Sequence, residues 1–135
     1  MVEKKNNSMD EAIDEINSSL EDSRGLEIHK IRLGSVLSAG VVSLIENYLK
    51  KLDVFKSGGK IDHRWLKKKK ENAKSLIGNQ ITCPVENVER LDVFLDKAYK
   101  IESERNKIVY GSNVSEDNLK KLIDLFLELK KEVGK

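Results

Sequence analysis

The largest group of chemically useful side chains is a basic stretch between residues 60 and 74. Seven basic residues meet only two acids there, Asp62 and Glu71. The basic residues are Lys60, Arg64, Lys67, Lys68, Lys69, Lys70 and Lys74. Such a stretch attracts phosphate groups, and it can equally be the solvated face of a helix. Five of these side chains are therefore candidate contacts for an RNA backbone: Lys67, Lys68, Lys69, Lys70 and Lys74.

A second unusual segment runs from Glu102 to Gly111 and gathers Arg105, Asn106 and Tyr110. One interpretation is structural: Arg105 pairs with Glu102 one turn earlier, and Tyr110 packs with its hydroxyl at the rim of the core. The other interpretation is a functional site, because an arginine, an amide and a phenol are concentrated at the end of a predicted helix.

Standard catalytic and metal-binding patterns are missing from the rest of the sequence. The two histidines, His29 and His63, fall on different predicted helices without an evident carboxylate or cysteine companion. This favours a surface position for each of them. The single cysteine, Cys83, permits neither an internal disulfide nor a Cys-rich zinc site. We therefore expect no metal and no cofactor.

The run ERNKIVYG resembles the signature of the HEPN superfamily. These small α-helical proteins carry an arginine followed at short spacing by a histidine, often written Arg-Asn-x-x-x-His-Gly. Arg105 matches the arginine, Asn106 the polar residue after it and Gly111 the glycine, while Tyr110 stands where the family has histidine. The stretch LIENYLKKL and a last helix capped by Ser-Glu-Asp are also similar to the family. The resemblance covers about residues 26–133.

The resemblance implies a homodimer in which two copies of the motif meet at a shared cleft and, in active members, cut RNA without a metal. In that chemistry arginine stabilises charge developing on the phosphate, and histidine moves protons as the ribose 2′-hydroxyl attacks. Arg105 would keep the electrostatic role, and Asn106 would orient it or bind a phosphate oxygen. Tyr110 is a poor base at neutral pH, since tyrosine has a pKa of about 10, although its ring could stack on a nucleobase.

The spacing of Arg105 and Tyr110 adds a geometric condition. A separation of five residues corresponds to about 140° around a continuous helix. The two side chains therefore share a site only if the helix ends or distorts between them, or if each protomer of a dimer completes the other's cleft.

The spacing of apolar residues predicts the elements that must position these groups. Helices are expected over about residues 8–20, 28–55, 62–77, 84–104 and 115–131. Asp62 and Ser115 are the expected caps of two of them. Residues 57–59 should end the second helix, and its small residues predict a close helix contact, within the chain or across a dimer. Tyr99 falls on the apolar stripe of the fourth helix.

The composition agrees with a single helical domain. The 135 residues include one proline and eight glycines, and aromatic residues make up only 5%, which favours an all-α bundle of four or five helices over a β-sandwich. Residues 1–7 are polar and expected to fray. No apolar run approaches the roughly 20 residues of a membrane span, and the N-terminus lacks a secretory signal, so we expect a cytoplasmic protein without membrane contacts.

Two functions fit the sequence. The first is a HEPN-like RNA-binding protein related to endoribonuclease toxins or antiphage effectors, with a neutralising or regulatory protein partner and with catalysis impaired by Tyr110. The tyrosine would then mark either a naturally degenerate member or an inactivated nuclease. The alternative is a non-enzymatic helical adaptor that holds RNA backbone through its basic helix and is indifferent to Arg105.

Overall fold

The protein is an all-α bundle. The computed structural model describes residues 7–110 and 115–134, without the side chains of residues 7, 8, 109 and 110. These residues form the α-helices α1 (Asn7–Glu21), α2 (Lys30–Lys51), α3 (Lys70–Gly78), α4 (Leu91–Tyr110) and α5 (Glu116–Val133), and the short 3-10 helices η1 (Leu26–His29), η2 (His63–Lys67) and η3 (Val85–Asn87). The prediction of a bundle of four or five helices is confirmed.

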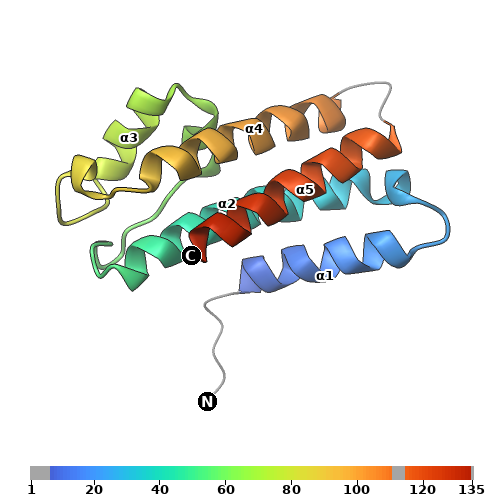
Figure 1. Ribbon diagram of the computed structural model, residues 1–135, viewed down its shortest axis with the longest axis horizontal. Helices are drawn as coiled ribbons and strands as arrows, with labels where there is room; N and C mark the ends of the chain where they lie inside the picture. Colours follow the sequence, from blue (N-terminus) through green and yellow to red (C-terminus); the bar gives the residue numbers. More distant parts are fainter. Residues whose placement is uncertain (1–6, 111–114, 135) are drawn as a thin grey trace, which may run out of the picture.

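Helix α2 lies at the centre of the bundle and packs against α1, α4 and α5 (Figure 1). Its apolar residues recur at three- and four-residue steps, so they form one broad buried surface. Leu33, Leu37, Val41, Ile45 and Leu49 of α2 are completely buried. The shorter α3 lies beside the first half of α4, and η2 packs against α4 as well.

Helix α2 ends at Lys51, earlier than the prediction of a helix through Phe55. Asp53 has a positive φ of 62°, and the amides of Asp53 and Val54 donate to the carbonyls of Lys50 and Leu49 at 2.9 and 3.1 Å. These two bonds satisfy carbonyls of the last helical turn in a Schellman arrangement. The chain reverses there, and Phe55 forms an isolated antiparallel bridge with Ile81 instead of continuing the helix.

The basic stretch is not the single helix that the sequence predicted. Asp62 caps η2 as expected, accepting a hydrogen bond from the Arg64 amide at 2.9 Å. The backbone is then extended at Lys68, and α3 begins only at Lys70. The break lets both parts pack: Leu66 of η2 and Ala73 of α3 are buried. Tertiary packing thus overrides the local helix preference of the lysines.

The small residues of α2 make a close contact within the chain. A Cβ atom on Gly40 would lie 2.9 Å from Cε1 of Phe126 and 3.1 Å from Cβ of Ala12. Helices α1, α2 and α5 therefore meet at Gly40, where only glycine fits. Of the two expected locations for this contact, Gly40 takes the one within the chain, while Ser35 and Ala39 stay exposed.

One segment, Leu26–Lys51, is long and apolar enough to cross a membrane by length and composition. The expectation that no segment reaches this limit is therefore wrong. Half of its most apolar window is buried inside the bundle, which is also what the central helix of a bundle requires.

Candidate nucleic-acid interface

Arg105 lies on α4 with its side chain turned toward α2. Its Nε donates to the Gly34 carbonyl at 3.3 Å, and Nη1 donates to the amide oxygen of Asn106 at 3.4 Å. The predicted pairing of Arg105 with Glu102 is not among the hydrogen bonds of either side chain. Glu102 is buried and accepts a hydrogen bond from the Ser38 hydroxyl at 2.8 Å. Arg105 is thus anchored by one neutral carbonyl and one amide, which leaves its charge uncompensated by these partners.

Arg105 lines a groove between α2, the segment before η2, and α4. Its lining residues are Ser35, Ser38, Ala39, Val42, Lys60, Ile61, Asp62, His63, Arg64 and Arg105, and its volume is about 740 Å³. We call it the Arg105 groove. Its one lining acid, Asp62, forms an ion pair with Arg64 at 2.6 Å, and the hydrogen bonds from Arg64 hold the pKa of Asp62 below its ordinary value. The remaining charged residues of the groove are cationic.

His63 joins Arg105 in this groove, which the sequence did not predict. Its side chain is partly buried, and Nδ1 is buried without a hydrogen-bond partner among the described residues. The ring therefore brings an imidazole into a groove that already holds a guanidinium. No local spacing could have revealed this pair, since His63 and Arg105 come from separate elements.

The backbone of α4 is helical without interruption from Leu91 to Tyr110. The condition that the helix ends or distorts between Arg105 and Tyr110 is therefore not met. Positions 105 and 110 face directions about 140° apart, so a site containing both would need a second protomer. The Tyr110 side chain itself, and Gly111, lie outside the described residues.

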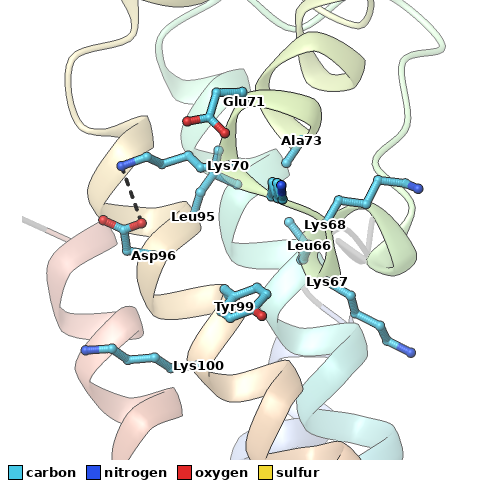
Figure 2. Close-up of a pocket in the computed structure, with 11 residues that line it drawn as sticks. Leu66, Lys67, Lys68, Lys70, Glu71, Ala73, Leu95, Asp96, Tyr99 and Lys100 are labelled. Atoms are coloured by element: carbon cyan, nitrogen blue, oxygen red, sulfur yellow. Dashed lines mark ion pairs between the residues drawn. The ribbon is translucent and has the colours of Figure 1, made fainter.

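The lysines predicted to bind RNA are divided by the structure. Lys67, Lys68, Lys69 and Lys70 line a second groove, of about 540 Å³, whose other lining residues are Leu66, Glu71, Ala73, Leu95, Asp96, Tyr99 and Lys100 (Figure 2). We call it the lysine groove. Lys74 does not line it: Lys74 pairs with Asp92 at 2.9 Å, and this contact raises the pKa of Lys74 and lowers that of Asp92.

Most cations of the lysine groove are available to a ligand. Lys70 forms an ion pair with Asp96 at 3.5 Å (Figure 2). Within residues 7–110 and 115–134, the other four lysines, Lys67, Lys68, Lys69 and Lys100, form no ion pair. Helix α3 also begins at this groove without a side-chain cap, so its first amides add to the positive potential.

The two grooves adjoin because η2 contributes to both. Residues 63 and 64 line the Arg105 groove, and residues 66 and 67 line the lysine groove. Helix α4 supplies Arg105 to one and Tyr99 to the other. Basic side chains thus line a groove on each side of this shared element.

His29 is not the isolated surface residue that the sequence predicted. Its Nδ1 lies 2.8 Å from a carboxylate oxygen of Glu15, and its Nε2 lies 2.8 Å from one of Asp22. Two carboxylates can both be satisfied only if both ring nitrogens carry protons, so this geometry favours imidazolium. The hydrogen bonds to Asp22 and Glu15 raise the pKa of His29. Each carboxylate also forms an ion pair with an arginine: Asp22 with Arg24, and Glu15 with Arg32.

This contact predicts a pH dependence of stability. A folded-state pKa above the unfolded value of about 6.5 means that the His29 contribution is complete below that pH and is lost as pH rises through the folded pKa. We therefore expect the free energy of unfolding, measured with urea at several pH values, to fall above about pH 6.5. The fall should be largely absent in His29→Gln. A slope that persists unchanged in this variant would assign the pH dependence to other groups.

Within the part of the chain that the structure describes, no group of three or more His, Cys, Asp or Glu side chains is placed to hold a metal ion. The candidate interface is thus defined by basic, imidazole and aromatic side chains around η2 and α4. In comparisons with known proteins, no family model, curated protein or solved structure matches the chain.

Proposed function

We propose that this protein is a HEPN-like RNA-binding protein that holds the RNA backbone on the basic surface formed by the two grooves. The observation that carries the proposal is that η2 joins both grooves. Lys60, Arg64 and Arg105 line one of them, and four lysines without ion pairs line the other. Cationic side chains gathered around one short element attract a polymer of phosphates. The choice of RNA follows from the resemblance of ERNKIVYG to the HEPN signature.

The charge pattern of the two grooves favours a polyanionic ligand. Asp62 pairs with Arg64 and Asp96 with Lys70, and although Glu71 also lines the lysine groove, cations outnumber acids in the lining of both grooves. Phosphate contacts fix the position of a nucleic acid without reading its sequence. We therefore expect binding with little sequence preference.

A second candidate function, metal-independent RNA cleavage, is favoured by one observation: His63 and Arg105 line the same groove. An imidazole can take the proton of a ribose 2′-hydroxyl as its oxygen attacks the phosphorus, and the bond to the 5′-oxygen breaks as that oxygen receives a proton. A guanidinium stabilises the charge on the phosphate. The products would be a 2′,3′-cyclic phosphate and a 5′-hydroxyl.

The proposal includes a homodimer. Ile28 and Ile31 are more than half exposed, and the exposed Ser35 and Ala39 continue from Ile31 along the same face of α2 to the rim of the Arg105 groove. Burying this face against a second copy would remove apolar surface from water and bring two such grooves together. A neutralising or regulatory protein partner remains an expectation from the HEPN resemblance.

Salt-dependent binding tests the proposal. We expect the native protein to bind RNA with an affinity that falls steeply as KCl increases. In the triple variant Lys67→Gln, Lys68→Gln, Lys69→Gln, the slope of log K against log salt should flatten by about 2, because each phosphate contact on a single strand contributes about 0.7. Fluorescence anisotropy of a labelled RNA over 50–300 mM KCl measures both quantities.

The matched control places the same charge change on α5, in the variant Lys120→Gln, Lys130→Gln, Lys131→Gln, whose three lysines are all exposed. This variant should keep a nearly native slope, since long-range charge alone is largely screened at these salt concentrations. Equal slopes for the two triple variants would contradict a lysine-groove site. Arg105→Ala distinguishes the adaptor alternative, which predicts unchanged binding.

A further inference from the structure

We infer that the lysine groove takes single-stranded RNA, with one base stacked on the ring of Tyr99 and the adjoining phosphates held by Lys67, Lys68, Lys69 and Lys100. The inference rests on the proposed RNA binding and specifies the form of RNA that this surface accepts.

Tyr99 is exposed although the sequence placed it on the apolar stripe of α4. The residue is 49% exposed, whereas Leu95, one turn earlier, is buried. Among the described residues, Tyr99 makes no hydrogen bond or ring contact. Tyr48 differs, because its ring packs edge to face on Phe94 with centroids 4.7 Å apart. The Tyr99 ring therefore keeps surface that a planar partner can cover.

Cations flank this ring on two sides. Figure 2 shows Tyr99 between Lys100, which follows it on α4, and Lys67, which comes from η2. Lys68 and Lys69 lie on the segment between η2 and α3 and line the same groove. Single-stranded nucleic-acid sites combine these same two features, a basic groove for the backbone and an aromatic ring for a base.

The ring selects single strands for a steric reason. In an RNA duplex the bases are stacked on one another inside the helix. A protein side chain at its surface therefore reaches only the RNA backbone and the base edges in the duplex grooves. A base of a single strand can turn out and cover the ring. The groove volume of about 540 Å³ lies within the range of about 300–1,000 Å³ typical of small-molecule sites, which is sufficient for a nucleobase.

The same strand can continue toward Arg105. Tyr99 and Arg105 are six residues apart on α4, which corresponds to about 9 Å along the helix axis. The two positions face directions about 120° apart around α4, so a strand must turn around the helix past η2 to pass from Tyr99 to the Arg105 groove.

The test compares Tyr99→Leu with Tyr99→Phe in the full chain, using a labelled single strand of about ten nucleotides, a hairpin duplex, and an abasic strand of the same length as probes. We expect Tyr99→Leu to weaken binding of the single strand about tenfold, because stacking of one base contributes about 1–3 kcal/mol. The salt slope should not change, since the ring carries no charge. Tyr99→Phe should bind like the native protein, and the abasic strand should not distinguish the variants.

Each failure of this test has a separate meaning. An equal loss in Tyr99→Leu for single strand, duplex and abasic strand would overturn the stacking inference and assign Tyr99 a structural role. Unchanged single-strand binding in Tyr99→Leu would overturn it as well, and equally effective competition by inorganic polyphosphate would then identify a general polyanion site. If the native protein binds none of the RNA probes even at low salt, the proposed RNA binding itself fails, and this inference fails with it.

Discussion

Tyr110→His is expected to create or raise metal-independent RNA cleavage by about 10² to 10⁴-fold, the usual contribution of a positioned proton-transfer group. Tyrosine has a pKa of about 10 and imidazole one of about 6.5, so only the substituted chain would hold an effective base at this position near neutral pH. Arg105 of a second protomer would supply the charge stabilisation, since positions 105 and 110 of one chain face about 140° apart. Cleavage should persist in EDTA and leave cyclic-phosphate ends, which gel analysis and end-group treatment of a labelled RNA detect.

Two further variants identify the groups involved. Arg105→Ala added to Tyr110→His should abolish the gain, because the developing phosphate charge loses its counter-charge. His63→Ala separates the two candidate imidazoles: if the native protein already cuts RNA and His63→Ala stops it, His63 supplies the proton transfer. Light scattering on each variant checks for the expected dimer, at twice the mass of the chain.

An inactive Tyr110→His protein would also be informative. If this variant forms the dimer, binds RNA and cuts nothing across a varied RNA panel, then a histidine at position 110 is not sufficient to restore nuclease activity. The binding function would then replace the enzymatic one.

Gly40→Val is expected to destabilise the protein by about 3 kcal/mol, near the upper end of the usual cost of overpacking. Even a single Cβ atom at this position would lie 2.9 Å from the Phe126 ring and 3.1 Å from Cβ of Ala12. Both neighbours are completely buried, so neither ring nor methyl can move aside without disturbing the contact between α1, α2 and α5. A loss of this size is a large part of the 5–15 kcal/mol that typically stabilises a domain.

Urea unfolding of Gly40→Val and Ala39→Val measures this effect. Ala39 is exposed on the same helix, so its substitution by valine adds no steric clash and should cost only about 0.5 kcal/mol, from the lower helix propensity of valine. Phe126→Leu should recover part of the loss in the Gly40→Val background, because the two positions touch. A loss in Gly40→Val no larger than that in Ala39→Val would contradict the packing argument, because valine has a higher helix propensity than glycine and a lower one than alanine.

The helix content and much of the core could be predicted from the sequence because the relevant signals are local. In α5, Leu119, Leu122, Ile123, Phe126 and Leu129 are buried as their spacing indicated, whereas Leu127, predicted to pack with them, is 39% exposed. Ser115 caps this helix as expected, accepting a hydrogen bond from the Asn118 amide at 3.2 Å. Such contacts join residues three or four positions apart, so a short window of sequence contains both partners.

The helix boundaries in the basic region were decided by tertiary packing. The run from Asp62 to Gly78 is rich in good helix formers, chiefly leucine, lysine and alanine, and its propensity alone favours one helix. The structure breaks it between η2 and α3, because Leu66 and Ala73 both find buried positions beside α4. Because of this break, the four consecutive lysines at positions 67–70 all line the lysine groove.

The chemical environment of single residues depended on the tertiary structure most of all. The sequence by itself determined that Arg105 and Asn106 lie near the end of a long helix and that lysines dominate residues 67–70. Only the fold placed His63 and Arg105 in one groove, held His29 between Glu15 and Asp22, and exposed Tyr99 in the lysine groove. Most of these partners come from different elements, and packing of the bundle, which local periodicity does not encode, brings them together.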